Sequence, residues 1–162
     1  MVRRALTGDA DSIAGIIVDA WQTAYAGIVD AEYSASLNRE KYSGVFTSII
    51  RENKQTVFVF EKNNTVFGVV SGKKEAGKYD SQVVGLYVHP EEQGSGIGSS
   101  LLEEMKKHFE SENCKTMIIW TLLGAKNNSF YKKHDGILRE SKEIRLGEKA
   151  YPGVGFAFDL LQ

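Results

Sequence analysis

Residues 83–105 constrain the fold more strongly than any other segment, because three structural signals follow one another there in a fixed order. The apolar, β-branched run VVGLYV predicts a strand that ends at His89-Pro90. The glycine-dense sequence QGSGIG at 93–98 predicts a tight turn. Apolar residues then recur at helical spacing with charged residues between them: Ile97, Leu101, Leu102, Met105 and Phe109. The segment therefore predicts a strand, a glycine-rich turn and a long helix.

A turn of this kind before a helix is suited to binding an anion. The first N–H groups of a helix have no partners within it, and the helix dipole places partial positive charge at the same end. Glycines at 94, 96 and 98 remove the Cβ atoms that would keep a phosphate from the backbone, although a sharp connection without a ligand uses the same residues. A Walker-type loop is excluded, because Gly98 is followed by Ser99-Ser100 and no lysine. A dinucleotide fingerprint is disfavoured, because the next predicted strand ends in Leu123-Gly124 without an acid.

The segment resembles the acyl-CoA loop of the GNAT superfamily of N-acyltransferases, whose signature is Gln/Arg-x-x-Gly-x-Gly/Ala after a strand ending in Val-x-Pro. Gln93, Gly96 and Gly98 match this signature, and Val88-His89-Pro90 matches the strand end. A second family element, Ala/Ser-x-x-Phe-Tyr-x-x-x-Gly-Phe, resembles the sequence SFYKKHDG at 129–136. The chain is identified as a GNAT member because both motifs occur in the family's order.

The resemblance implies a set of site residues. Tyr131 is expected to be catalytic, and the expected cofactor-binding residues are Leu86, Tyr87, Val88, Gln93, Gly94, Ser95, Gly96, Ile97, Gly98, Ser99 and Asn127. The chain departs from the family pattern at Gly124, where many members have an asparagine that binds the cofactor; Asn127 and Asn128 lie nearby. It departs again where Asp135-Gly136-Ile137 replaces the family's Gly-Phe.

Composition bounds the class of protein. A chain of 162 residues that is 42% hydrophobic is long enough for one core, so residues 1–162 are expected to form a single domain. The formal net charge of -1 gives no basic excess that would favour nucleic acid or an anionic membrane. The single Cys114 excludes an intrachain disulfide, and no apolar run is long enough to cross a membrane, so we expect a cytoplasmic protein.

The remaining pattern predicts a mixed α/β protein. Strands are expected at 2–5, 56–61, 65–71, 117–122, 141–146 and 151–159. Helices are expected after Thr7-Gly8-Asp9, whose side chains can cap the first one, after Asp30, which can cap a short helix through Leu37, up to about Arg51, and at 126–134. The apolar strand at 117–122 favours parallel pairing with the strand before the glycine-rich turn. The resemblance implies a GNAT fold, with a mostly antiparallel central sheet, one splayed parallel pair, and helices on both faces. It also implies that the first helices, with Trp21 and Tyr25, form a wall of the acceptor site.

Acyl transfer to an amine requires a held thioester, a neutral amine, donors to the carbonyl oxygen and an acid for the thiolate. The resemblance places Tyr131 beside the thiolate, and a strand bulge is expected to free N–H groups near 86–88. The general base stays open among five residues: Asp80, His89, Glu91, Glu92 and Glu140. Cys114 is not expected to carry the acyl group, and His108 and His134 lack the spacing of metal ligands, so no metal is implied.

The predicted function is therefore transfer of an acetyl group from acetyl-CoA directly to a primary amine in a ternary complex. The acceptor is a small molecule or a peptide, and the sequence does not distinguish them. The alternative is a GNAT-like module that binds CoA as a sensor without transferring anything. A homodimer is also expected, with the strand segment at 153–156 contributing to it.

Overall fold

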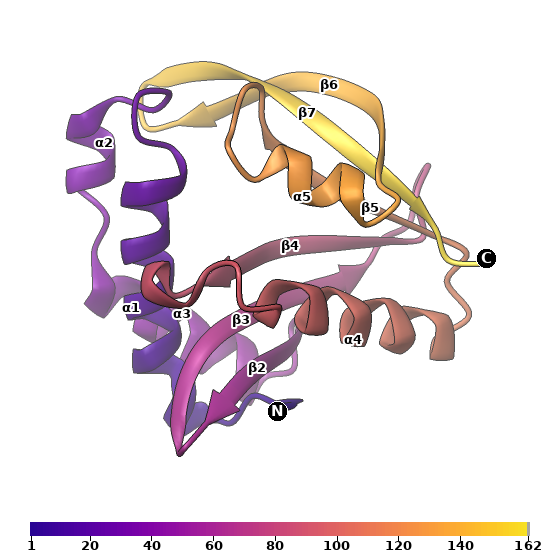
Figure 1. The fold of residues 1–162 in the computed structure, drawn as a ribbon, viewed down its shortest axis with the longest axis horizontal. Coiled ribbons are helices and arrows are strands. Elements are labelled where there is room, and N and C mark those ends of the chain that lie inside the picture. Colours follow the sequence, from indigo (N-terminus) through magenta and orange to yellow (C-terminus); the bar gives the residue numbers. More distant parts are fainter. Residues whose placement is uncertain (162) are drawn as a thin grey trace.

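The computed structural model describes residues 1–161, which form a seven-stranded sheet with helices on both faces (Figure 1). The strands are β1 (Val2–Arg4), β2 (Thr56–Lys62), β3 (Thr65–Lys74), β4 (Ser81–Val88), β5 (Thr116–Leu122), β6 (Ile137–Leu146) and β7 (Lys149–Asp159). Their order across the sheet is β1-β2-β3-β4-β5-β7-β6, and within the described chain only β4 and β5 run parallel. The predicted mixed α/β class, with one parallel pair in a mostly antiparallel sheet, is confirmed.

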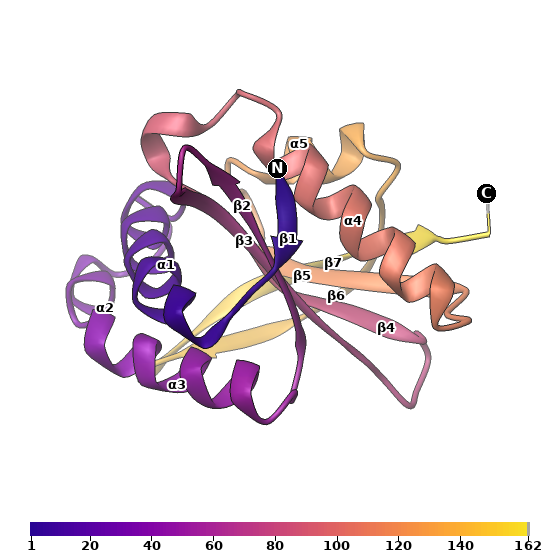
Figure 2. The ribbon, with the colours of Figure 1, turned by 90° about the horizontal axis from the view of Figure 1, so that it is seen from below.

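The helices lie in two layers because alternate residues of the central strands are apolar on opposite faces. As Figure 2 shows, α1 (Ala10–Ala24) and α3 (Arg39–Arg51) lie on one face, and α4 (Ile97–Ser111) with α5 (Asn128–Lys133) on the other. In β2, Val57 and Val59 pack toward α1 and α3, whereas Phe58 packs toward α4. The apolar stripe of α4 is fully buried, and its members are Leu101, Leu102, Met105 and Phe109. Each face of the sheet therefore has its own hydrophobic core.

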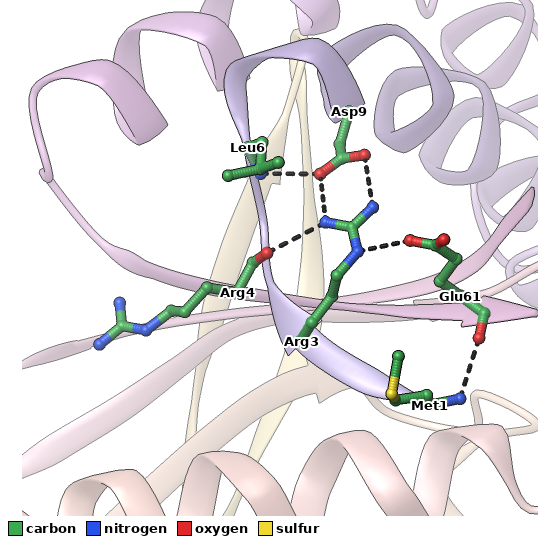
Figure 3. A network of polar contacts seen from close by, with 6 residues as sticks. All are labelled: Met1, Arg3, Arg4, Leu6, Asp9 and Glu61. Atoms are coloured by element: carbon green, nitrogen blue, oxygen red, sulfur yellow. Dashed lines mark hydrogen bonds and ion pairs between the residues drawn. The ribbon is translucent and has the colours of Figure 1, made fainter. Parts of the chain in front are cut away.

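The start of the chain differs from its prediction. The Asp9 carboxylate was expected to cap α1, but it makes no side-chain capping bond to that helix. It accepts hydrogen bonds from the Leu6 N–H at 2.7 Å and from the Arg3 guanidinium at 2.8 and 3.0 Å (Figure 3). Arg3 also pairs with Glu61 of β2, so one guanidinium joins β1, β2 and the approach to α1. The hydrogen bond from Arg3, more than any other contact, lowers the pKa of the Asp9 carboxyl.

Several element bounds also differ from the sequence pattern. The short helix α2 (Ala31–Ala35) is capped as expected, since the Asp30 carboxylate accepts from the Glu32 N–H at 3.1 Å, but the helix ends before residue 37. Strand β6 begins at Ile137 rather than 141. Seven of its ten side chains are exposed and none is buried, so no apolar alternation marks its start in the sequence. Among residues 1–161 no helix has the length and hydropathy needed to span a membrane.

The parallel pair separates after a short stretch, and this opens the centre of the sheet. The paired residues of β4 and β5 are Ser81 with Met117, Gln82 with Ile118, and Val83 with Ile119. Beyond Val83 a register shift against β3 marks a β-bulge at Val84, and β4 continues along β3 to Val88. A bulge bends its strand, so it directs the end of β4 away from β5. The expected splayed pair is therefore present.

The predicted dimer contact at 153–156 is wrong as an edge contact. These residues belong to β7, which is hydrogen-bonded to β5 on one side and to β6 on the other. Its backbone groups are therefore already paired, and the outer edge of this half of the sheet is β6.

Candidate functional site

A cavity of about 450 Å³ lies at the end of β4, beyond the point where its pairing with β5 stops. Its walls are the end of β4, the glycine-rich turn, the start of α4, helix α5 and the end of α1. Tyr131 and all the predicted cofactor-binding residues except Ser95 line it. The Ser95 hydroxyl instead donates a hydrogen bond to the Glu92 carbonyl, within the turn.

The turn has the geometry of an anion site. Gly94 and Gly96 have φ angles of 85° and 89°, which L side chains rarely adopt, and a Cβ at either would meet open space. Gly96 is the N-cap of α4, and the Ser100 N–H donates to its carbonyl at 3.1 Å. The N–H groups of 97–99 precede that first helical bond, so they are left for a ligand in the cavity.

The turn is fixed in place from both sides. The Gln93 side-chain amide donates to the Val88 carbonyl at 3.3 Å, which ties the turn to the end of β4. On the other side, a Cβ at Gly98 would lie 3.4 Å from the Phe130 ring, so a small residue there lets α4 and α5 approach closely. The motifs predicted at 93–98 and 129–136 are thus in contact with each other.

The end of β4 presents alternate backbone groups to the cavity. The His89 N–H donates to the Phe67 carbonyl of β3 at 2.8 Å. In an antiparallel pair such bonds recur at every second residue, so the backbone N–H of Tyr87 also faces β3, and those of Leu86 and Val88 face away from it. The pairing with β5 ends at Val83, so these two N–H groups point into the opened region. The predicted backbone donors are therefore Leu86 and Val88, and Tyr87 contributes through its side chain.

Among the side chains of the motif at 129–136, that of Tyr131 is the most deeply buried. It is 4% exposed, and its ring centroid lies 5.7 Å from that of Phe156. Burial raises the pKa of the Tyr131 phenol, with a further contribution from the neighbouring Tyr25 and Tyr87. The phenol therefore stays protonated well above neutral pH and is able to act as a proton donor, not as a base.

Two asparagines at the start of α5 have different tasks. Asn128 donates to the Leu122 carbonyl at 3.0 Å and accepts from the Thr121 hydroxyl at 3.1 Å, so it fastens α5 to the end of β5. Asn127 lines the cavity, and its amide oxygen lies 3.5 Å from the same hydroxyl. Of the two, Asn127 is the one placed to contact a ligand.

The α1 end of the cavity is aromatic. Tyr25 lies against Trp21 with their ring centroids 4.4 Å apart, and Trp21 donates its indole N–H to the Tyr87 hydroxyl at 3.2 Å. Burial raises the pKa of both the Tyr25 and the Tyr87 phenols. The Trp21 indole occupies one acceptor position of the Tyr87 oxygen, so the Tyr87 hydroxyl hydrogen points elsewhere.

The four carboxylates and one histidine left open as general base are mostly elsewhere. Only Glu92 of the five lines the cavity. The Asp80 carboxylate accepts from the Lys115 N–H at 2.7 Å, Glu140 pairs with Lys78, and the His89 ring accepts from the Glu91 N–H. Glu92 itself lies next to the glycine-rich turn in the chain.

Sequence reasoning assigned no role to several residues that line the cavity. Thr23 and the alanines of α1 form one wall, and three basic residues line the α5 side: Lys126, Lys133 and His134. The His134 ring lies 2.9 Å from the Ser99 hydroxyl and 4.4 Å from the Phe130 ring. Basic residues flanking the short helix at 126–134 were the available signal, because an anion beside the glycine-rich turn requires compensating charge. Phe130 is half-buried, packs against the core and lines the cavity as well.

The residues fit a CoA thioester. Bare positive-φ glycines and helical N–H groups suit a pyrophosphate, the basic residues suit further phosphate charge, and the free N–H groups of β4 suit an extended amide chain. Residues 1–161 contain no cluster of three or more His, Cys, Asp or Glu side chains able to hold a metal ion.

Comparisons with known proteins agree with this geometry. The model of the Acetyltransferase (GNAT) family matches residues 17–136. A relative from Bacillus subtilis, named uncharacterized N-acetyltransferase YuaI, is 27% identical over 136 residues, covering 82% of this chain and 78% of the relative. Spermidine N(1)-acetyltransferase of Thermoplasma acidophilum is 30% identical over 111 residues, covering 65% of this chain and 68% of that protein. Among solved structures, PaiA N-acetyltransferase of the same organism, in complex with coenzyme A, has a TM-score of 0.76 at 22% identity, covering 95% and 96% of the two chains.

Proposed function

The chain belongs to the acetyltransferase (GNAT) family of acyl-CoA-dependent N-acyltransferases, and we propose that it moves an acetyl group from acetyl-CoA directly to a primary amine, with both substrates bound together. The observation that carries the proposal is the meeting of both family motifs in one cavity, beside unpaired backbone donors of β4. The glycine-rich turn is the proposed anchor for the pyrophosphate.

Bound acetyl-CoA supplies the activated acetyl group, and the protein supplies position and proton handling. The N–H groups of Leu86 and Val88 are directed toward the opened region of the sheet, where they hold the pantetheine arm and stabilise negative charge on the thioester carbonyl oxygen. Tyr131 donates its phenolic proton to the departing thiolate, because burial keeps that phenol neutral.

The amine reaches the thioester from the aromatic end of the cavity, where Tyr25 and Tyr87 stand beside α1. These phenols have raised pKa values and are poor bases. Of the five groups left open as general base, only Glu92 lines the cavity, and it precedes the turn proposed to hold the pyrophosphate. We therefore propose that the amine enters neutral, or loses its proton to water, without a dedicated carboxylate base.

The proposed acceptor is an alkyl amine that binds beside Tyr25 and Tyr87. The relative from Thermoplasma acidophilum is named for spermidine, which makes polyamines the first small-molecule acceptors to assay. The direct test measures free CoA thiol released from acetyl-CoA with three acceptor groups: polyamines, simple monoamines, and peptides with a free N-terminus or lysine. Release with at least one group, and acetylated product in equal amount, is the expected result. Tight CoA binding without release in any group would instead support the sensor alternative.

A further inference from the structure

Thr121 is a buried hydroxyl residue near the end of the apolar strand β5. Its side chain is 3% exposed, like those of two serines elsewhere in the sheet, Ser71 and Ser81. A buried hydroxyl costs free energy unless it is hydrogen-bonded, so its partners decide what a threonine does at such a position. The partners of Thr121 come from the start of α5 and from the end of α1.

The hydrogen of the Thr121 hydroxyl is committed to Asn128. The Asn128 amide nitrogen donates to the Leu122 carbonyl at 3.0 Å. A carbonyl oxygen only accepts, so the nitrogen of this amide faces Leu122 and its oxygen faces Thr121. The Thr121 hydroxyl therefore donates its one hydrogen to the Asn128 oxygen, at 3.1 Å. Any other group that hydrogen-bonds to the Thr121 oxygen must donate to it.

The Tyr25 hydroxyl lies within hydrogen-bonding reach of Thr121 and Asn127. Both neighbours present acceptors to it: the lone pairs of the Thr121 oxygen, and the Asn127 amide oxygen, which lies 3.5 Å from the Thr121 oxygen. The hydrogen that satisfies them is that of the Tyr25 phenol, which therefore points inward, toward β5 and α5. The two lone pairs of the phenol oxygen are left for the cavity that Tyr25 lines.

The rest of Tyr25 is held in place. Its N–H donates to the Trp21 carbonyl at 3.3 Å, and its own carbonyl accepts from the Ile28 and Val29 N–H groups, each at 3.0 Å. Its ring belongs to a buried cluster that also contains Val29 and Leu122. The freedom that remains to the phenol is rotation of its hydroxyl hydrogen, and this rotation is what the Thr121 oxygen restricts.

The direction of that hydrogen matters for a neutral amine. Such an amine has N–H donors and one lone pair, and the lone pair must reach the carbonyl carbon of the thioester. An oxygen that only accepts binds an N–H and leaves the lone pair free. A hydroxyl hydrogen turned toward the cavity would bind the lone pair instead, and would hold the amine in an unreactive orientation.

We propose that Thr121 is a positioning residue for the transfer: its hydroxyl keeps the Tyr25 hydrogen turned inward, so that the Tyr25 oxygen accepts an N–H of the acceptor amine. The inference rests on the proposed function and adds to it a residue that is not among those lining the cavity. Tyr25 holds the amine by one N–H and does not take its proton.

Thr121→Val removes the hydroxyl and keeps the shape of the side chain. With an amine that the wild-type chain acetylates, kcat measured as free CoA thiol should fall about tenfold or more, KM for the amine should not rise, and CoA affinity should be unchanged. Thr121→Ser keeps a hydroxyl and should recover most of the wild-type kcat. An unchanged kcat in Thr121→Val would overturn the inference.

Ser81→Ala is the matched control. It also removes a buried hydroxyl from the sheet, one that donates to the Thr116 carbonyl at 2.8 Å and does not line the cavity. It should leave kcat within about twofold of the wild-type value, because it touches neither Tyr25 nor the amine. Equal falls in kcat for Thr121→Val and Ser81→Ala would show a general loss of packing and would overturn the inference.

Tyr25→Phe tests the route through the phenol. It removes the oxygen that accepts the N–H, so KM for the amine should rise by about tenfold. In this background Thr121→Val should cause no further fall in kcat, since no hydroxyl hydrogen remains to be oriented. A fall that persists there would mean that Thr121 acts through Asn128 and α5 and would overturn the inference, as would an unchanged KM in Tyr25→Phe.

The same assays separate this inference from the proposed function. A folded wild-type chain that releases no CoA thiol with any amine would overturn both. A wild-type chain that acetylates an amine at the same rate as Thr121→Val would overturn only the role of Thr121. Circular dichroism of each variant shows whether it is folded, and the comparison of Tyr25→Phe with wild type decides the role of the phenol if Thr121→Val does not fold.

Discussion

Tyr131, the proposed proton donor, is also part of the hydrophobic core. Its ring packs near Phe156 in the core, and it also lines the cavity. Burial raises the pKa of its phenol, so the hydroxyl keeps its proton at neutral pH. Packing and proton donation therefore depend on different parts of the same residue, and a substitution that removes only the hydroxyl separates them.

We expect Tyr131→Phe to lower kcat about a hundredfold, because it removes the proton donor and keeps the ring. CoA affinity and the melting temperature should change little. A thioester whose thiol has a much lower pKa needs less protonation and should be less sensitive. Because the phenol pKa is raised, wild-type kcat should show no decline caused by Tyr131 as the pH rises toward 10. An unchanged kcat with a higher KM for the amine would contradict the assignment and make Tyr131 an acceptor-binding residue.

Asp9 binds Arg3 and the Leu6 N–H, and it does not cap α1 as its position before that helix predicted. Its pKa is lowered in the folded protein by Arg3, so the pair stabilises the fold above the ordinary carboxyl pKa of about 4, and the contribution is lost as the pH falls through the folded pKa. Asp9→Asn should lower the free energy of unfolding at pH 7 by about 1–3 kcal/mol. Urea unfolding at pH 7 and at pH 3 measures this, and the difference from wild type should shrink at pH 3.

Asp11 provides the control for that experiment. Its carboxylate pairs with Arg39 at 3.0 Å, but both side chains are largely exposed. Surface pairs of this kind contribute about 0–1 kcal/mol. Asp11→Asn should therefore have a small effect on the free energy of unfolding. An equal loss of stability in both variants would mean that the Arg3–Asp9 pair contributes no more than an exposed ion pair.

The strand, turn and helix around residues 83–105 form the element that is proposed to hold the cofactor. Gly96→Asp introduces two changes, a side chain at positive φ and a negative charge beside the proposed phosphate site. Gly96→Ala introduces only the first. Calorimetry should show CoA binding at least tenfold weaker for Gly96→Asp than for Gly96→Ala, since a like charge nearby costs several kcal/mol at an effective dielectric constant of about 20. Equal affinities in the two folded variants would remove this turn from the phosphate site.

Helix α2 contacts the β6–β7 hairpin next to Trp21 and Tyr25 of the cavity's aromatic end. The Asp30 carboxylate pairs with Lys149 at 2.7 Å, and the Asp30 N–H donates to the Tyr151 hydroxyl at 3.0 Å. Tyr33 of α2 also lies close to Gly147 in the hairpin turn. Tyr151→Phe removes the hydrogen bond and leaves the ring, so KM for the amine should change while CoA affinity does not. Titration of both substrates against the variant measures this, and a change confined to CoA would contradict it.

Elements with strong local signals were predictable from sequence, and those set by distant partners were not. The apolar stripe of α4 and the glycines before it follow from neighbouring residues alone, as does the Asp30 cap. The extent of β6 could not be predicted from neighbouring residues, because an exposed strand of charged residues is specified by its partner β7 and not by its own pattern. Ser95 and Asp9 were misplaced for a related reason: short polar side chains choose among several nearby backbone partners, and the tertiary fold decides which is in reach.

The whole molecule depends on contacts between segments that are far apart in the chain. Phe156 of β7 is fully buried in the core that also contains α4 and β5. Phe156→Ala should lower the free energy of unfolding by about 3–5 kcal/mol, and urea denaturation measures the change. Phe60, partly buried at the edge of the same core, is the control, and Phe60→Ala should cost less. Equal losses would mean that the core is not centred on β7.

The position of β7 between β5 and β6 has a consequence for folding. β7 follows both of its neighbours in the chain, yet it lies between them in the sheet. Until residues 149–159 dock, β5 has an open edge and β6 has no partner, so the folding chain exposes the apolar face that Phe156 and Phe158 later cover. Such an intermediate is prone to aggregate. Chaperones that shield the open edge of β5 until β7 docks will therefore increase the fraction of refolding chains that become native protein.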